Sequence, residues 1–252
     1  MSFDVAAASY DEFMGRYSRL LSPQMVELAG IEPGDRVLDV GCGTGSLVME
    51  LVNLLGAAAV AGVDPSETFV DAARQRHPNV RIELATAEAL PFEEHSFDAT
   101  LAQLVVHFMT DPVAGIGEMR RVTRPGGTVA VSVWDFAGGH APLSLFWDVA
   151  RELDPTAVDE SKLAGVREGH LVELCDAAGL RNVTETSLEI SLGHAGFDEW
   201  WEPYTGGVGP AGSYLKSLPV DSQEALRRRC HAALPEGPFA VTARAWAVRG
   251  TS

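Results

Sequence analysis

Between residues 36 and 134, short apolar runs alternate with segments of helical periodicity, and this alternation constrains the fold more than any other feature. The runs that predict strands are Arg36–Val40, Ala57–Val63, Val80–Ala85, Phe97–Val105 and Thr128–Trp134. Strand–helix alternation requires crossover connections, which place the strands parallel with helices on both faces of the sheet. A length of 252 residues, with 46% hydrophobic and 21% charged residues, fits one α/β domain with a sizeable insertion.

Several helix boundaries are marked by local signals. Ser66 is expected to cap the helix that follows the second strand, and Asp111 to cap a helix that starts with Pro112 and ends before a Pro-Gly-Gly turn. Upstream, residues 9–30 predict two short helices. Ser22 would cap the second of these, and Pro23 would take its first helical position.

The chain after residue 134 has a different pattern. It predicts a helix at Leu143–Leu153, an amphipathic helix that ends at Gly179 and a strand at Val183–Leu192. Residues 193–237 then show helical patterns separated by Gly and Pro, and the chain closes with the alternating strand pattern "FAVTARAWAV". We interpret residues 193–237 as an insertion that covers one end of the sheet.

A glycine-rich loop follows the first strand, in the stretch "VLDVGCGTGS" at residues 37–46. Glycine allows a tight turn with positive φ and lets a ligand touch the backbone, so this loop predicts a binding site at the carboxyl end of the strand. A dinucleotide site requires G-x-G-x-x-G. Counted from Gly41, the third glycine of that pattern would be residue 46, which is Ser46, and the observed pattern is G-x-G-x-G.

Two acids indicate which ligand the loop takes. Asp39 precedes the first glycine by two residues, where a carboxylate repels a pyrophosphate and suits an ammonium or other cation. Asp64 ends the second strand, where a carboxylate can accept both hydroxyl groups of a ribose. S-adenosylmethionine has a ribose, a sulfonium and an amino-acid tail, and therefore fits. The alternatives are that Asp39 only caps the next helix and that Asp64 only begins a turn.

With these residues in place, about residues 10–135 resemble a class I S-adenosylmethionine-dependent methyltransferase. The similarity is to the group that includes the ubiquinone and menaquinone C-methyltransferases, also called methyltransferase type 11. Besides "VLDVGCGTG", the stretches that carry it are "GVDPSETFVDAAR", "TAEALPFEEHSFDATLAQLVVHFMTDP" and "RVTRPGGTVAVSVWD". The resemblance implies a doubly wound Rossmann-like sheet of seven strands, mostly parallel with an antiparallel last strand, plus a helical cover. It divides the chain into a lid (1–30), the core (31–192), the cover (193–237) and the final strand (238–252).

The resemblance also implies roles for individual residues. The glycine loop would contact the methionine and ribose parts of the cofactor, and the family's Gly-Asp-Ala at the end of the third strand is replaced here by residues 85–87, Ala-Thr-Ala. Tyr17, together with Arg16, would close over the methionine tail from the lid; the alternative for Tyr17 is a packing role in the core. The cofactor-binding residues expected in this way are Tyr17, Asp39, Gly41, Cys42, Gly43, Gly45, Asp64, Pro65, Phe69, Thr86, Ala87, Glu88 and Gln103.

Residues for the methyl acceptor are less well marked. His107 follows the fourth strand and is the candidate base, with a packed core histidine as the alternative; His140 and His194 are weaker candidates. Trp200 and Trp201 are adjacent, so a helix is not expected to point both inward. We expect Trp201 and Tyr204, with Trp134 at the end of the fifth strand, to line the acceptor pocket.

Charge and cysteine content limit the partners. The formal net charge of −16 argues against nucleic acid and against an anionic membrane surface. Three scattered cysteines and an N-terminus without a secretory pattern predict a cytoplasmic protein with reduced thiols, and no residue spacing predicts a metal site. A small-molecule methyltransferase, monomeric or homodimeric, is therefore expected. The alternatives are an NAD-dependent oxidoreductase and a non-catalytic S-adenosylmethionine-binding protein.

Overall fold

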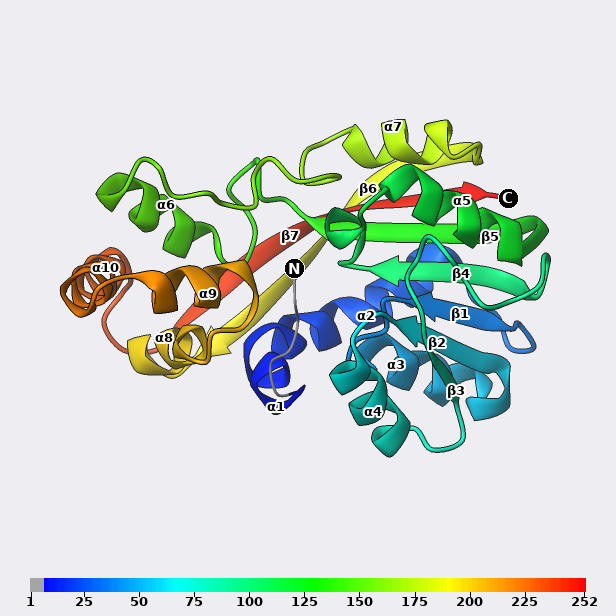
Figure 1. Cartoon of the computed structure of the whole chain (residues 1–252), viewed down its shortest axis with the longest axis horizontal. Coiled ribbons are helices and arrows are strands. Elements are labelled where there is room, and N and C mark those ends of the chain that lie inside the picture. Colours follow the sequence, from blue (N-terminus) through cyan, green and yellow to red (C-terminus); the bar gives the residue numbers. More distant parts are fainter. Residues whose placement is uncertain (1–6) are drawn as a thin grey trace.

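A computed structural model describes residues 7–252, and its centre is one seven-stranded sheet (Figure 1). The strand β7 runs antiparallel to its neighbours β5 and β6, whereas the other pairs in the sheet are parallel. This confirms the predicted Rossmann-like α/β fold with an antiparallel last strand. In order across the sheet, the strands are β3 (Arg81–Leu84), β2 (Val60–Asp64), β1 (Val37–Val40), β4 (Phe97–Gln103), β5 (Thr123–Trp134), β7 (Phe239–Thr251) and β6 (Arg181–His194).

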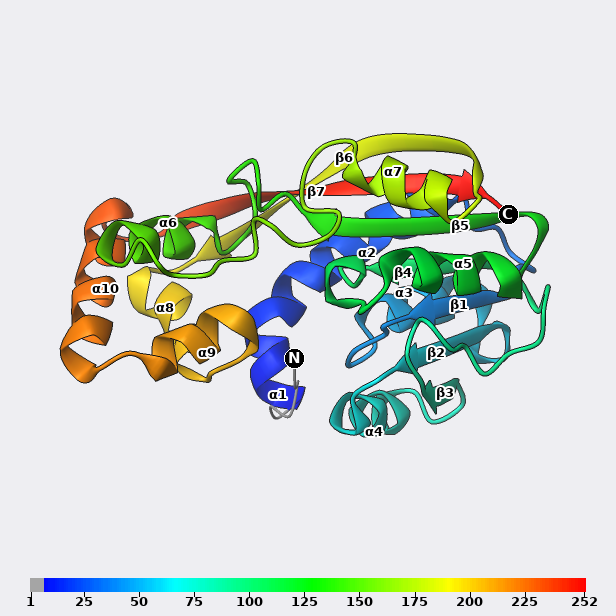
Figure 2. The same cartoon turned by 45° about the horizontal axis from the view of Figure 1, so that its top comes forward.

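Helices cover both faces of this sheet, as Figure 2 shows. On one face α2 (Arg16–Ala29) packs against α3 (Ser46–Leu55), and on the other α5 (Pro112–Val122) packs against α7 (His170–Ala177). The helix α4 (Glu67–Arg76) lies beside β2 and β3. The central strand β1 is buried on both sides, as a parallel strand between two helical layers must be.

A second group of helices lies at the far ends of the long strands β6 and β7 (Figures 1 and 2). It contains α8 (Phe197–Thr205), α9 (Gly209–Ser217) and α10 (Val220–Ala233), which follow β6 in the chain, and α6 (Ser144–Leu153), which packs against α10. Between this group and the sheet lies the N-terminal segment, with α1 (Ala7–Tyr10) and a single π-helical turn at Asp11–Gly15.

The prediction of two short N-terminal helices was wrong, because α2 is continuous and contains Pro23 in its interior. The Ser22 side chain caps nothing and instead donates a hydrogen bond to the carbonyl oxygen of Ser18, 2.9 Å away. Burial of Tyr17, Leu21 and Met25 on one face stabilises the helix through the proline. Tertiary packing therefore overrides the local signal.

The expectation that a helix does not point both adjacent tryptophans inward was also wrong. Trp200 is 2% exposed and Trp201 is 6% exposed. Both can be buried because α8 is surrounded by aromatic neighbours: Trp201 contacts Phe146 of α6, and both tryptophans contact Tyr204. The exposed positions of α8 are Asp198, Glu199, Glu202 and Thr205, so the buried side of the helix is wide enough to take both rings.

Several strand limits differ from the predicted ones. Residues 57–59, expected to begin the second strand, form a 3-10 turn before β2. Two other ends differ for a reason that the backbone shows. In β5 the pairing with β4 moves from Thr123 to Thr128, so that the Pro-Gly-Gly residues bulge out of the ladder within the strand. At the other end, β4 stops at Gln103 because Leu104 takes a left-handed backbone with φ of 63°. Such a conformation is strained for a residue with a Cβ and is often found beside functional sites.

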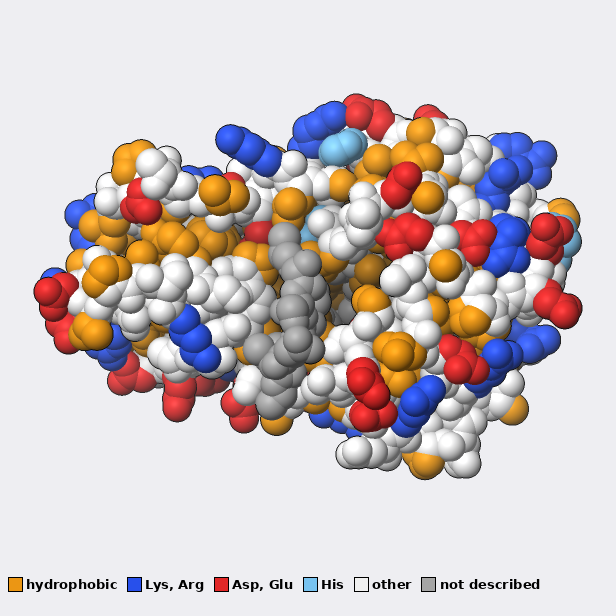
Figure 3. All heavy atoms as spheres, viewed as in Figure 1, with side chains coloured by type: hydrophobic (Ala, Val, Ile, Leu, Met, Phe, Trp, Pro, Cys, Tyr) orange, Lys and Arg blue, Asp and Glu red, His pale blue; other side chains and the backbone are white. Residues whose placement is uncertain are grey.

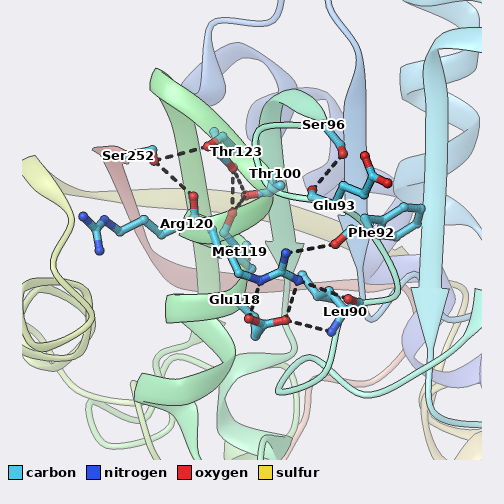
Figure 4. Close-up of polar contacts among 11 residues, drawn as sticks. Leu90, Phe92, Glu93, Ser96, Thr100, Glu118, Met119, Arg120, Thr123 and Ser252 are labelled. Atoms are coloured by element: carbon cyan, nitrogen blue, oxygen red, sulfur yellow. Dashed lines mark hydrogen bonds and ion pairs between the residues drawn. The ribbon is translucent and has the colours of Figure 1, made fainter.

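Arg121 ties α5 to the loop between β3 and β4. Its guanidinium donates to the carbonyl oxygens of Phe92 (2.9 Å) and Leu90 (3.2 Å) and forms a two-point ion pair with Glu118. Glu118 in turn accepts from the backbone N–H of Leu90 at 3.1 Å. Figure 4 shows this network beside a second one, in which the Ser252 hydroxyl bonds the carbonyl oxygen of Arg120.

The substitution Arg121→Lys should destabilise the fold by about 1–3 kcal/mol, because an ammonium cannot reproduce the fork of donors that reaches four acceptors. Urea unfolding measures this loss. The matched control is Arg228→Lys, since Arg228 makes a single exposed pair with Glu224. Equal midpoints for the two variants would contradict the role given to Arg121.

Candidate functional site

The parallel register brings the ends of β1, β2 and β4 to one edge of the sheet. Val40 pairs with Val63, and Asp39 lies between Gly62 of β2 and Leu101 of β4. The glycine loop leaves β1 at this edge and returns as α3. Loops at the carboxyl ends of parallel strands form the binding crevice of such folds.

The glycine loop keeps a conformation that other residues could not adopt easily. Gly41 has φ of 72°, and a Cβ there would lie 2.4 Å from the Val105 side chain. Gly43 has φ of 54°, but a Cβ there would find its nearest neighbour, Tyr10, only 4.0 Å away. Gly41 therefore fits the loop to the protein, whereas Gly43 leaves a backbone surface that a ligand can touch.

Asp64 connects the glycine loop to the start of α4. One carboxylate oxygen accepts from the backbone N–H of Gly43 and the other from that of Ser66, both at 2.9 Å. Ser66 caps α4 by accepting from Phe69 N–H, as predicted. Each carboxylate oxygen has a second lone pair, so Asp64 can hold both loops and still accept hydroxyl groups.

Asp39 is a buried carboxyl group with an unused oxygen. The residue is 1% exposed, and Oδ2 has no hydrogen-bond partner among residues 7–252. Burial and the nearby charge of Asp64 raise the pKa of Asp39 to about 8, and the backbone N–H of Val48 offsets this only in part. A buried acceptor without a donor is costly, so this position favours a ligand that brings donors and positive charge.

Gln103 provides a second unused oxygen at the same place. Its Nε2 donates to the carbonyl oxygen of Ser18 at 3.1 Å, which orients the amide, and its Oε1 has no partner within the described part of the chain. Asp39, Gln103, Tyr10 and residues of the glycine loop line one small cavity of about 20 Å³, which we call the glycine-loop cavity. Two acceptors without donors in one cavity suit an ammonium, which can donate to both of them with two of its three N–H groups.

The other expected cofactor residues lie at the ends of β2 and β3. Phe69 is buried and contacts the Tyr10 ring, with centroids 5.0 Å apart, whereas Pro65 is exposed. Thr86 is exposed and Ala87 is buried in the loop after β3. Glu88 accepts from the backbone N–H groups of Thr110 and Asp111, and these bonds lower its pKa against the opposing effect of burial. Glu88 is thus already used to hold the start of α5.

The N-terminal segment covers the glycine loop through Tyr10 and Asp11 rather than through Tyr17. Asp11 accepts from the Thr44 hydroxyl at 2.5 Å and forms an ion pair with Arg76 of α4. Tyr17 lies away from the glycine-loop cavity, and its hydroxyl is 3.3 Å from Nε2 of His194 on β6. Arg16 pairs with Glu199 of α8. The segment is therefore tied to the core on one side and to the helical group on the other.

A second, largely apolar cavity of about 40 Å³ adjoins the first, and we call it the aromatic cavity. Tyr10 lines both cavities, and the strained Leu104 faces the second where Gln103 faces the first. His107 and Trp134, which the sequence analysis proposed for the acceptor site, also line the aromatic cavity. Figure 3 shows hydrophobic side chains gathered between α6 and α9 on this face of the molecule, beside a hollow in the surface.

His107 is a neutral group in this cavity. It is 6% exposed, and burial lowers its pKa to about 3. Its Nδ1 has no partner among residues 7–252, and the same is true of Nε1 of Trp134. His107 can therefore accept or donate a hydrogen bond at neutral pH, but it is a weak base.

Four other candidates lie away from the cavity. Trp201 and Tyr204 belong to the buried aromatic cluster around Phe146, whose ring stacks on Tyr204 with centroids 4.7 Å apart. His140 bonds Asp135, and His194 contacts Tyr17. None of these four lines the aromatic cavity.

Of the residues that line the aromatic cavity, sequence reasoning named His107 and Trp134 and missed the others, including Tyr10 and Glu160. Tyr10 lies within the predicted lid (1–30), and Glu160 lies in the irregular segment between α6 and α7. Glu160 belongs to no motif or periodic pattern, and the helical pattern over residues 9–30 does not mark Tyr10 as a cavity residue. Only the fold brings them together.

Cys42 does not have the environment of a reactive cysteine. The residue is buried within the glycine loop, and burial raises the pKa of its thiol well above the usual value. Its Sγ lies 3.8 Å from the carbonyl oxygen of Gly43. The thiol therefore stays protonated and acts as a small packing group.

Comparison with known proteins agrees with this geometry. Residues 38–131 match the family described as "Methyltransferase domain". Residues 38–131 therefore resemble a methyltransferase domain. The chain is 36% identical over 138 residues to the ubiquinone/menaquinone biosynthesis C-methyltransferase of Bdellovibrio bacteriovorus, a match that spans 51% of this chain and 58% of that relative. A demethylmenaquinone methyltransferase of Beutenbergia cavernae is 34% identical over 134 residues, spanning 52% and 55% of the two chains.

Solved structures show the same fold. A phosphoethanolamine N-methyltransferase of Haemonchus contortus in complex with S-adenosylhomocysteine has a TM-score of 0.58 at 15% identity, covering 100% of this chain and 60% of that one. That protein binds S-adenosylhomocysteine, the product form of S-adenosylmethionine. The unused oxygens of Asp39 and Gln103 fit its ammonium group, and the open face of Gly43 fits a closely approaching ligand.

Two kinds of feature are not found in the part of the chain that the structure describes. No helix within residues 7–252 has the length and apolar character that crossing a membrane requires. Over the same residues, no three or more His, Cys, Asp and Glu side chains form a group that could hold a metal ion.

Cofactor binding should release a proton from Asp39. With a pKa of about 8, the ligand-free carboxyl group is protonated at pH 6.5, and an ammonium beside it favours the carboxylate. The affinity for S-adenosylhomocysteine should therefore rise between pH 5.5 and 7 by up to about tenfold per pH unit. Calorimetric titration in two buffers of different ionisation enthalpy measures the released proton.

The control for this experiment is Asp39→Asn, which keeps the shape of the side chain. This variant should bind S-adenosylhomocysteine more weakly and without proton release. Proton release that is unchanged in Asp39→Asn would assign the titration to another group.

Proposed function

We propose that this protein transfers the methyl group of S-adenosylmethionine to a small-molecule acceptor held in the aromatic cavity. The supporting observation is that the two cavities adjoin at the end of β4. Gln103 lines one and Leu104 the other, and Tyr10 lines both. A cofactor bound by its ammonium at Asp39 would thus lie next to a dry pocket.

Methyl transfer needs alignment more than covalent help from the protein. The methyl carbon is already activated by the sulfonium, so the site must hold the nucleophile in line at about 3 Å and exclude water. In this proposal Asp39 and Gln103 hold the ammonium and Asp64 holds the ribose. Phe69, Pro65 and the Thr86–Glu88 backbone would surround the adenine. His107, neutral at pH 7, would orient the acceptor by a hydrogen bond.

The charge of the chain supports a small acceptor. With a net charge of −16, the surface repels the phosphates of nucleic acids and anionic lipids. The Bdellovibrio relative is named for quinone biosynthesis, but the aromatic cavity is built largely from residues outside the matched segment 38–131. We therefore do not propose a quinone as the acceptor of this protein. We propose that the protein is cytoplasmic and has no nucleic acid or membrane partner.

Asp64→Ala should weaken S-adenosylhomocysteine binding by roughly 1–3 kcal/mol, or about 5- to 150-fold, because it removes the ribose acceptor and releases the Gly43 loop. Isothermal titration measures the change. Asp71→Ala is the matched control, since Asp71 is an exposed carboxylate on α4. An Asp64→Ala variant that binds as tightly as the native protein would disprove the assignment.

Methyl transfer itself is tested with S-adenosylmethionine labelled in its methyl group, incubated with fractionated metabolites. Label should pass to a small organic product with the native protein and far more slowly with Asp64→Ala. Tight cofactor binding without transfer to any fraction would favour a non-catalytic cofactor-binding protein. Binding of NAD in place of S-adenosylhomocysteine would favour an oxidoreductase.

A further inference from the structure

The aromatic cavity carries one acidic group in an otherwise apolar wall. Glu160 lines it from the segment between α6 and α7 and is only 3% exposed. The aromatic side chains that share this wall come from the N-terminal segment and from the ends of β4 and β5. They are Tyr10, Phe13, Phe108, Trp134 and Phe136.

Glu160 is oriented but not neutralised by its surroundings. Its Oε2 accepts from Nε1 of Trp147 at 3.0 Å, and its Oε1 makes no hydrogen bond with the residues that the structure describes. Arg151 is paired with Asp148 and Asp159 instead. Burial raises the pKa of Glu160 to about 7, against the smaller opposite effect of the Trp147 bond. A carboxyl group in such a place exchanges its proton near neutral pH.

No positive charge opposes this carboxylate. The cavity-lining residues within 7–252 include neither lysine nor arginine, and burial keeps His107 neutral. The negative charge of Glu160 is therefore the only charge that the wall can offer to a ligand. Packing alone does not explain it, because an apolar side chain would fill this wall without the cost of burying an acid.

Aromatic faces together with one carboxylate form a site for a cation. The rings present negative π-faces, which attract an ammonium within about 6 Å of a ring centroid, and a carboxylate adds charge and hydrogen-bond acceptors. We propose that the methyl acceptor is a primary or secondary amine, bound as its ammonium against Glu160 in the aromatic cavity. This inference rests on the proposed methyl transfer and names the class of its acceptor.

The chemistry balances with Glu160 as the proton acceptor. The ammonium gives one proton to the Glu160 carboxylate, which leaves a neutral amine with a free lone pair. That lone pair forms the new N–C bond as the S–C bond breaks, and the S–C electron pair stays on sulfur. The products are a methylammonium, neutral S-adenosylhomocysteine and protonated Glu160, which then loses its proton to water. Burial assists the first step because it lowers the pKa of an ammonium and raises that of a carboxyl group.

Matched pairs of probes test the amine class. Methylamine, n-butylamine and phenethylamine are each compared with the alcohol of the same skeleton, by titrating tryptophan fluorescence of the full chain saturated with S-adenosylhomocysteine at pH 7.5. At least one amine should bind about tenfold or more tightly than its alcohol, and it should accept label from methyl-labelled S-adenosylmethionine. Equal binding, preference for the alcohols, or no amine binding by about 10 mM would overturn the inference.

The variant Glu160→Gln assigns the effect to this residue. Gln can still accept from Trp147, so the wall keeps its shape, but the amine should lose about tenfold or more in affinity and its advantage over the alcohol. Glu168→Gln makes the same chemical change at an exposed position of the same segment and should keep both. Thermal unfolding and S-adenosylhomocysteine affinity, both expected to be maintained in Glu160→Gln, show that the fold and the cofactor site are intact. An unchanged amine preference in Glu160→Gln would overturn the role of Glu160.

The outcomes separate this inference from the proposed function. Transfer of label to a hydroxyl-bearing or carbon acceptor, but to no amine, would leave methyl transfer standing and overturn the amine class. A native protein that binds no S-adenosylhomocysteine would overturn the proposed function and the amine class with it.

Discussion

The parallel pairing of β1 between β2 and β4 is the constraint on which the site depends. Hydrogen bonding in this register fixes where three strands end, and each strand delivers one polar side chain to the same edge: Asp39 near the end of β1, Asp64 at the end of β2 and Gln103 at the end of β4. The glycine loop can then turn back over β2, where Gly41 and Cys42 both donate to the Val63 carbonyl oxygen. The pairing of the strands thus fixes the positions of these three polar side chains, and the loops add to a site that the sheet has already placed.

Sequence reasoning succeeded where the determining interactions are local. The strand–glycine-loop–helix unit, the caps Ser66 and Asp111 and the alternating last strand all follow from residues a few positions apart. It failed where distant packing decides: Pro23 lies inside a helix that burial maintains, and both adjacent tryptophans are buried because α8 has aromatic neighbours on several sides. The wall of the aromatic cavity was beyond prediction for the same reason, since Tyr10, Trp134 and Glu160 are far apart in the chain and share no periodicity.

The two buried acids of the cavities, Asp39 and Glu160, lower the stability of the folded protein. The pKa of Asp39 is raised to about 8 and that of Glu160 to about 7, so the folded state binds these protons more tightly than the unfolded chain does. Their contribution to folding is therefore favourable at low pH and is lost as the pH rises from about 4 through the raised values. Apolar or amide residues would remove this cost. The acids instead leave acceptor oxygens facing two cavities, where a ligand with donors gains most from them.

Tyr10 gives the two cavities a common wall. Its ring packs at a tilt against Phe69 on the side of the glycine-loop cavity and faces the aromatic cavity on the other. The next residue, Asp11, bonds Thr44 and pairs with Arg76. Any displacement of the Tyr10 ring that enlarges one cavity also changes the shape of the other, so the volumes of the two cavities change together. A ligand in the glycine-loop cavity therefore affects the shape of the aromatic cavity through the position of the Tyr10 ring.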